Sequence, residues 1–144
     1  MTCDARVRFA FKVIDERAAS AVTSLETIQG ATPNMKFGLG TSDGKNIGAY
    51  SLQVVRETVN GGGFSLSLES GDGGISWGFL NQRGLWGDGN RLVSFSTTTS
   101  NSPGANTSVT ADIRVTTAID KSSNLPLTHA IPLDGLSTFE LIYL

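Results

Sequence analysis

The chain has 144 residues, of which 17 are glycine, 39% are hydrophobic and 17% are charged, and its formal net charge is −2. This length fits one domain with its own core, and the near-neutral charge gives no electrostatic basis for gripping a nucleic-acid backbone. No apolar run approaches the roughly 20 residues of a membrane helix. Abundant Gly, Ser, Thr and Asn favour short strands joined by tight turns. We therefore expect a single all-β domain over residues 1–144, without nucleic-acid or membrane partners.

Alternation of apolar and polar residues predicts the first strands. Residues 6–14 alternate cleanly, with Val7 on the same face as the apolar residues that follow it. Residues 17–22 are Ala-rich but too short for more than a helical turn. A short apolar segment follows at residues 35–39, and Asp43-Gly44 then predicts a tight turn.

The middle of the chain predicts two hairpins. Residues 47–59 and 64–68 are strand candidates on either side of the glycine-rich turn at residues 60–63. A second turn at residues 70–74 leads into a shorter strand at residues 75–80. Strands that flank a tight turn usually pair with each other, so we expect antiparallel hairpins at both turns.

The second half of the chain contributes three more predicted strands and one long loop. The strands lie at residues 91–98, 109–115 and 136–144, and a glycine-rich loop occupies residues 81–90. In total we expect about eight to ten strands, the number and spacing typical of a β-sandwich or barrel.

Residues 70–77, Ser-Gly-Asp-Gly-Gly-Ile-Ser-Trp, form the most specific local pattern. They resemble the Asp-box, a hairpin found in sialidase propellers. A sialidase needs this box in several blades and a much longer chain, whereas here it occurs once. We interpret Ser70, Asp72, Gly74 and Trp77 as a structural hairpin in which the aspartate accepts backbone N–H groups and glycine provides positive φ.

The remaining reactive side chains do not form a catalytic or metal-binding pattern. His129 is the only histidine and Cys3 the only cysteine, and the two are far apart in the sequence. Asp72 has only Glu69 as a neighbouring carboxylate, which is too few oxygen ligands for calcium. No nucleophile-elbow motif is present. We expect no enzymatic activity, no metal and no cofactor.

Aromatic and polar residues gather in the predicted loop region. Trp77, Trp86, Arg83 and Asn90 could together contact a glycan, because lectins stack aromatic rings on sugars and use polar side chains for the hydroxyls. Burial of these aromatic residues in the core is the commoner outcome. A stand-alone carbohydrate-binding β-sandwich is therefore an alternative hypothesis.

The segment at residues 136–144 places Phe139, Leu141 and Tyr143 on one face of a strand. Most domains close with a polar, frayed tail, whereas this segment stays apolar to Leu144. Such a strand can pair edge to edge with another polypeptide.

The chain resembles a family of fimbria-like bacterial proteins related to chaperone–usher pilins. The matching stretches are residues 15–18, residues 37–40 through 48–50, the hairpin at 70–77, and residues 132–135 through 143–144. The resemblance implies an immunoglobulin-like pilin β-sandwich that lacks one strand. It also implies a precursor with a signal peptide, passage through the periplasm, and a final location in a cell-surface fimbrium.

In this family the groove left by the absent strand is filled first by a periplasmic chaperone and then by a neighbouring pilin subunit. The resemblance implies that Phe139, Leu141 and Tyr143 carry the partner-strand contact, with Leu144 supplying the anchoring carboxylate, and that Cys3 is half of a disulfide. The resulting hypothesis is a structural subunit assembled by donor-strand complementation, with a host glycan or surface receptor as a further partner if it is adhesive. A glycosidase is a third and weaker alternative, suggested only by the Asp-box.

Overall fold

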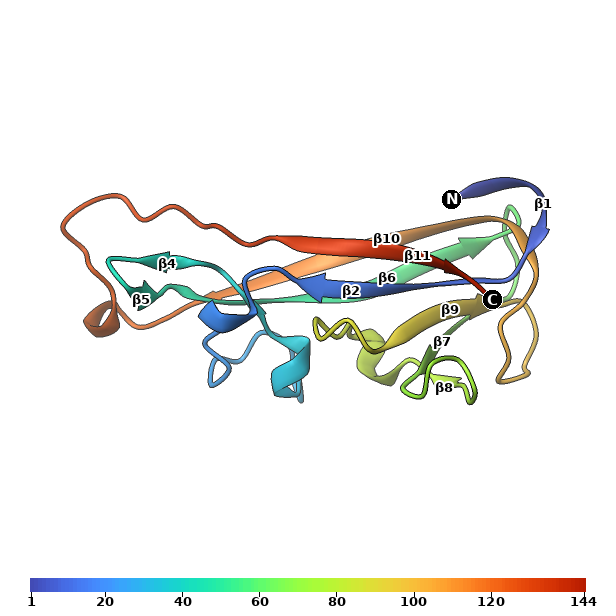
Figure 1. Ribbon diagram of the computed structural model, residues 1–144, viewed down its shortest axis with the longest axis horizontal. Coiled ribbons are helices and arrows are strands. Elements are labelled where there is room, and N and C mark those ends of the chain that lie inside the picture. The colour runs from blue at the N-terminus through green and yellow to red at the C-terminus, as the bar shows by residue number, and fades with distance from the viewer.

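The structure, a computed structural model that describes residues 1–144, is built from antiparallel strands in three sheets (Figure 1). The prediction of an all-β chain is confirmed. No helix is long and apolar enough to span a membrane. Four short 3-10 turns are the only helical elements: η1 (Ala18–Ser20), η2 (Pro33–Met35), η3 (Asn81–Arg83) and η4 (Ser122–Asn124).

Two larger sheets carry most of the chain. The four-stranded sheet has the order β1-β10-β6-β3, made by β1 (Thr2–Val7), β10 (Asn106–Ile119), β6 (Gly48–Val59) and β3 (Phe37–Gly38). The five-stranded sheet has the order β11-β2-β9-β7-β8, made by β11 (Ser137–Tyr143), β2 (Phe9–Asp15), β9 (Leu92–Ser96), β7 (Leu66–Ser70) and β8 (Gly78–Phe79).

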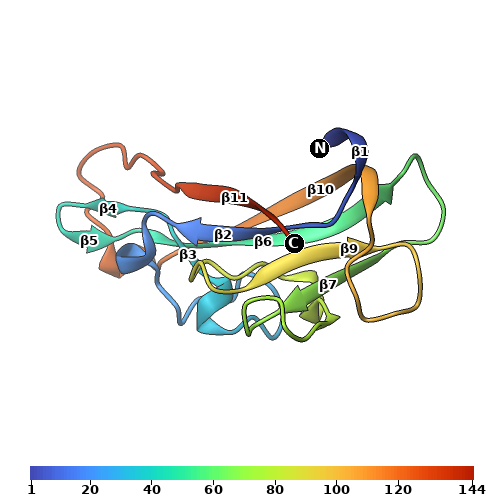
Figure 2. The same ribbon diagram turned by 45° about the vertical axis from the view of Figure 1, so that its right-hand side comes forward.

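The third sheet is the small hairpin of β4 (Thr41–Ser42) and β5 (Lys45–Asn46). Asp43 and Gly44 join its strands with positive φ angles of 48° and 72°, as a two-residue hairpin turn requires. The turn predicted from Asp43-Gly44 is confirmed. The hairpin lies at one end of the elongated molecule, and both chain termini lie toward the other end (Figures 1 and 2).

The two larger sheets share one core. A single cluster of 14 buried hydrophobic residues includes Val13 and Phe95 from the five-stranded sheet and Leu52 and Val54 from the four-stranded sheet. Burial of such side chains is the main favourable term in folding. The strands therefore present one apolar face to the other sheet, as their alternating sequences predict.

One side of this pair of sheets is closed by the chain itself. A segment at residues 84–88 forms a bridge from Gly84 to Gln53 of β6 and another from Asp88 to Ile14 of β2. The Leu85 N–H also donates to the Leu52 carbonyl at 2.9 Å. This segment links β6 of one sheet to β2 of the other and shields the core on that side.

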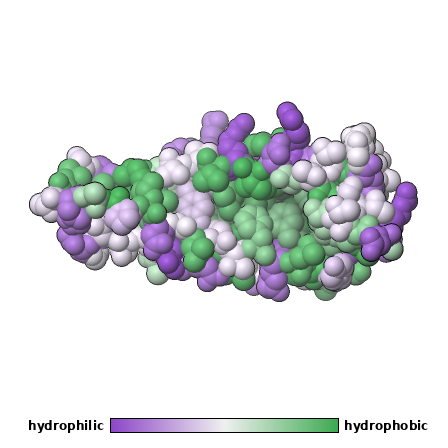
Figure 3. All heavy atoms as spheres, turned by 90° about the horizontal axis from the view of Figure 1, so that it is seen from above, coloured by the Kyte–Doolittle hydropathy of each residue, from purple (hydrophilic) through white to green (hydrophobic).

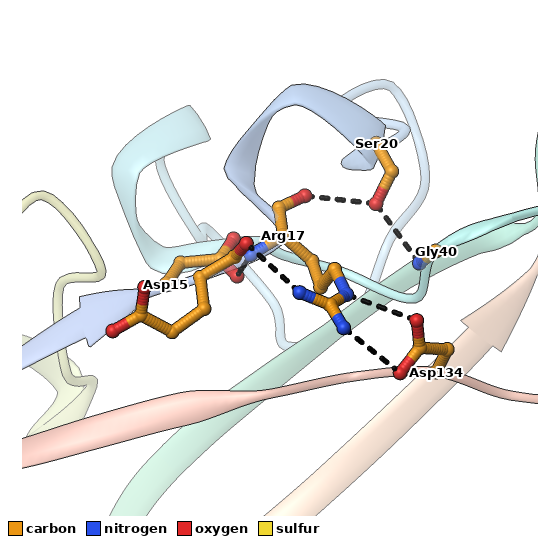
Figure 4. Close-up of polar contacts among 6 residues, drawn as sticks. Asp15, Arg17, Ser20, Gly40 and Asp134 are labelled. Atoms are coloured by element: carbon orange, nitrogen blue, oxygen red, sulfur yellow. Dashed lines mark hydrogen bonds and ion pairs between the residues drawn. The ribbon is translucent and has the colours of Figure 1, made fainter.

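A polar latch fixes the segment that leads into β11 (Figure 4). The Arg17 guanidinium donates to both oxygens of Asp134, from Nε at 2.9 Å and from Nη2 at 3.3 Å. Ser20 Oγ donates to the Arg17 carbonyl at 2.8 Å and accepts the Gly40 N–H at 2.9 Å. Asp15 accepts the Arg17 N–H at 2.9 Å. The latch therefore ties together the segment that follows β2, the segment that follows β3 and the segment that precedes β11.

Two predictions of strand connection are wrong. The strand expected at residues 6–14 is interrupted at Arg8, and β1 and β2 then enter different sheets. The turn at residues 60–63 does not close a hairpin, because β6 and β7 also belong to different sheets. Instead, Asn60 Oδ1 accepts the N–H of Thr107 at 2.8 Å, so the turn is held by the start of β10. The hairpin predicted at residues 70–74 does form, between β7 and β8.

The close packing at Gly38 gives a test of this fold. A Cβ on this buried residue would collide with the Arg17 carbonyl oxygen, which is backbone and cannot rotate away. We expect Gly38→Ala to lower the free energy of unfolding by about 1–3 kcal/mol, the usual cost of overpacking, measured by urea denaturation. The control is Gly78→Ala, because a Cβ there has no atom within 4 Å. Equal stability of the two variants would contradict this packing.

Candidate functional site

Two strand edges on the same side of the molecule have no partner. β10 pairs with β6 along residues 109–119, but on its other edge β1 reaches only to Val109, whose N–H donates to the Met1 carbonyl at 3.0 Å. β11 pairs with β2 alone. In both ribbon views β10 and β11 lie next to each other (Figures 1 and 2). Each therefore offers a row of free backbone N–H and C=O groups.

The core-facing side chains of β11 are only partly covered. Tyr143 is paired with Phe9, and Phe139 with Val13. Directly paired residues point to the same face of a sheet, and Phe9 and Val13 are buried in the core. Yet Tyr143 is 67% exposed, Phe139 50% and Leu141 45%. The inner face of the sheet is complete up to β2 and open at β11.

β10, in the four-stranded sheet, also has core-facing side chains that are left exposed. Val109, near the end that β1 covers, is buried. Val115 is paired with Leu52, and Leu52 is buried in the core, but Val115 itself is 60% exposed. Ile119, at the end of the strand, is 47% exposed. The row that should face the core is therefore uncovered along the second half of β10.

The space between these two rows is called the groove below. Figure 3, which views the molecule from above relative to Figure 1, shows hydrophobic side chains gathered around a recess in this face. One end opens into a cavity of about 390 Å³ lined by Arg6, Val7, Arg8, Ala105, Tyr143 and Leu144. The other end opens into an apolar cavity of about 460 Å³ lined by Ile47, Ile119, Leu125, Leu127, His129, Ile131 and Leu133. The first cavity thus includes Tyr143 of β11, and the second includes Ile119 of β10 together with residues of the loop between β10 and β11.

A few contacts hold β11 in place beside the groove. Tyr50 Oη and Ser137 Oγ form a hydrogen bond of 2.6 Å between β6 and β11. Burial raises the pKa of the Tyr50 hydroxyl and so favours its protonated form. The Phe139 ring lies 5.8 Å from the Phe11 ring. On the outer face, Lys12 pairs with Glu140 at 3.2 Å. β11 is thus already paired and held in place, although one of its edges has no partner and most of its inner face is exposed.

The sequence identified one wall of the groove and missed the other. Phe139, Leu141 and Tyr143 lie on the open row, as their alternation indicates, and Leu144 lies at its end with its side chain 48% exposed. Val115 and Ile119 were not recognised as site residues. The apolar alternation of the strand predicted at residues 109–115 includes Val115 and continues to Ile119. Alternation identifies the apolar face of a strand, but it does not show which strand edge lacks a neighbour.

The Asp-box residues form a closed polar turn. Asp72 Oδ1 accepts the Ser76 N–H at 2.9 Å and the Ser70 hydroxyl at 2.7 Å. Trp77 Nε1 donates to the Gly74 carbonyl at 3.0 Å. All of these bonds lie within the turn itself, so the carboxylate holds the backbone and is not aimed at a cavity.

Three of the four residues considered for glycan contact have separate partners inside the protein, and the fourth, Asn90, has no side-chain partner. Trp77 bonds the turn described above. The Arg91 guanidinium lies 3.8 Å from the centre of the Trp86 ring. Arg83 binds the Val54 carbonyl and the Glu57 carboxylate, and Asn90 is exposed on the loop. Their polar groups therefore do not converge on one free surface.

The two residues with reactive side chains stand alone. His129 is exposed and lies at one end of the groove, with Nε2 3.3 Å from Ser42 Oγ. Cys3 is half-buried and has a free thiol. No group of three or more His, Cys, Asp or Glu residues is arranged to hold a metal ion.

Acid titration tests the Asp-box turn. Hydrogen bonds from the Ser76 hydroxyl, the Ser76 N–H and the Ser70 hydroxyl hold the pKa of the Asp72 carboxyl well below its usual range. Such a group stabilises the fold above the unfolded pKa of about 3.9, and this stability is lost as the pH falls toward the folded pKa. We expect Asp72→Asn to melt below the wild type at pH 7, with the gap narrowing below about pH 4.

The matched control is Asp112→Asn, which removes an exposed carboxylate on β10. Asp112 makes no side-chain hydrogen bond or ion pair, so this variant should not reproduce the pH-dependent gap. A gap between Asp72→Asn and the wild type that stays constant down to pH 2 would show that the carboxylate does not hold the turn.

Comparison of the chain with models of protein families, with curated proteins and with solved structures found no match. The assignment of a function therefore depends on the groove and on the chemistry of the residues around it.

Proposed function

We propose that this protein is a structural subunit that accepts a β-strand from another polypeptide into its groove. The fold is then an immunoglobulin-like pilin β-sandwich with one strand position open, and the subunit belongs to a fimbria-like assembly built by donor-strand complementation. The observation that carries the proposal is the pair of uncovered core-facing rows: Phe139, Leu141 and Tyr143 on one sheet, and Val115 and Ile119 on the other.

The shape of the groove favours a strand over a small molecule. Residues 110–119 of β10 have a free edge, and β11 contributes seven residues, or about 23 Å of extended chain. An inserted strand would satisfy backbone groups along such an edge. Its alternate side chains would also cover the exposed rows. No compact ligand supplies both a ladder of hydrogen bonds and a repeat of side chains at this spacing.

The exposed apolar surface explains why a partner is needed. Monomeric proteins rarely leave large contiguous apolar patches in water, and a long free edge invites pairing with other chains. A periplasmic chaperone would cover the groove during transport, and the donor strand of a neighbouring subunit would replace it in the fimbrium. Under this proposal the protein has no catalytic step, and its activity is assembly.

Addition of a strand should stabilise the protein. The probe is a synthetic ten-residue peptide with valine and threonine at alternating positions, compared with a scrambled peptide of the same composition. We expect the alternating peptide to raise the melting temperature in a concentration-dependent way, because it binds only the folded state. It should also reduce self-association in analytical ultracentrifugation. A sharply melting monomer that neither peptide affects would mean that the groove does not accept a strand.

A charge placed in the groove should block acceptance without unfolding the free protein. Val115→Glu puts a carboxylate on the exposed inner row, where it stays hydrated until a strand covers it. Burial of an unpaired charge is strongly unfavourable, so we expect binding of the alternating peptide to weaken by at least about tenfold.

The control for this variant is Arg114→Glu on the adjacent, outward-facing position of β10. It introduces the same carboxylate and a larger change of net charge, but outside the groove. Peptide affinity should stay within about threefold of the wild type, since exposed charges contribute little. Equal loss of affinity in the two variants would indicate a nonspecific charge effect and would contradict strand insertion at this face.

A further inference from the structure

A second hollow lies at the end of the molecule that carries the β4–β5 hairpin. Its volume is about 630 Å³, and eight of its ten lining residues are polar or glycine. Three separate parts of the chain form its walls: residues 21–24, residues 44–46, and residues 120–124 around η4. It is called the tip pocket below. None of its lining residues lines either end of the groove.

The backbone of Ile47 and Gly48 holds the walls together. The Asp120 N–H donates to the Ile47 carbonyl at 2.8 Å, and the Val22 N–H donates to the Gly48 carbonyl at 3.1 Å. The third wall, β5, leads directly into the same two residues. Lys36 Nζ also donates to the Thr23 carbonyl at 2.6 Å. Because the walls are fixed before any ligand arrives, binding need not order three loops.

The side chains on these walls carry unused hydrogen-bonding capacity. The hydroxyls of Thr23, Ser24 and Ser123, the amide of Asn46 and the ammonium of Lys45 make no hydrogen bond or ion pair within the protein. Hydroxyls both donate and accept, and an amide offers two donors and an acceptor. Only Ala21 and Val22 are apolar. The pocket is thus equipped for a ligand with many hydroxyl groups, not for an apolar one.

Asp120 adds an oriented acceptor to this set. Asn124 Nδ2 donates to Asp120 Oδ2 at 2.8 Å, and the Lys121 N–H donates to Oδ1 at 2.8 Å. These bonds lower the pKa of the carboxyl, so they stabilise its ionised form. Each oxygen keeps a lone pair for a further donor. A carboxylate held in this way can accept from two neighbouring hydroxyls of one sugar ring.

The charges that line the pocket disfavour a strongly anionic ligand. Lys45 and Asp120 balance each other, so the lining has no excess of cations to attract phosphate or sulfate groups. From this combination of a preformed hollow, free neutral polar groups and one oriented carboxylate, we propose that the tip pocket binds a neutral carbohydrate. This site differs from the loop region around Trp86 and is independent of the groove.

The test combines a printed array of neutral mono- to tetrasaccharides with ¹H–¹⁵N NMR titration, using the methyl glycoside of the best-bound sugar. We expect binding on the array, with chemical shift changes centred on residues 21–24, 44–46 and 120–124. Asp120→Asn and the double variant Thr23→Val/Ser123→Ala should each weaken binding by about fivefold for each hydrogen bond lost. Ser102→Ala, which removes an exposed hydroxyl from another loop, should bind as the wild type does.

Three results would overturn the proposal: no binding to any sugar on the array, shift changes centred on Trp77 and Trp86, or unchanged affinity in all tip-pocket variants. The test is separate from the strand-addition test, because Val115→Glu should leave sugar binding intact. Loss of peptide binding without loss of sugar binding, or the reverse, therefore shows which of the two sites has failed.

Discussion

The pairing of β11 with a single neighbour is the constraint on which the groove depends. Seven consecutive pairs join β11 to β2, and the free edge on its other side faces the unpaired half of β10. If the chain supplied one more strand between them, both inner rows would be buried and the fold would be closed. Residues 1–144 place large apolar residues on each row and no strand between them. Such a surface is costly in water, which is the basis of the proposal that another polypeptide covers it.

The two sides of the molecule differ in a way that keeps this empty position accessible. On one side, the segment at residues 84–88 links β6 of one sheet to β2 of the other. On the other side, Tyr50 of the four-stranded sheet binds Ser137 at the start of β11, and Arg17 binds Asp134 in the segment just before this strand. These contacts fix the start of β11 and leave most of its edge free. A strand could therefore be added without dismantling an existing sheet.

Local sequence signals predicted strand faces well and strand neighbours poorly. Alternation correctly placed Phe139, Leu141 and Tyr143 on one face, and Asp43-Gly44 fixed its own hairpin, because both depend on adjacent residues. The break at Arg8 and the crossing at residues 60–63 depend on which sheet each strand joins, and no local pattern encodes that. The Arg17–Asp134 pair spans 117 residues, and the tip pocket combines three distant segments. Both arise only from tertiary packing.

The order of pairing also has a kinetic consequence. Glu16 and Thr138, which are hydrogen-bonded where β2 and β11 meet, are 122 residues apart, and β1 likewise pairs with the start of β10. Contacts at such separation close slowly, because the chain entropy of a long loop is lost before any contact is gained. During synthesis, β1 and β2 therefore wait for partners that emerge much later. In that interval the apolar face of β2 is open to aggregation, so a factor that shields it would raise the yield of folded protein as well as its stability.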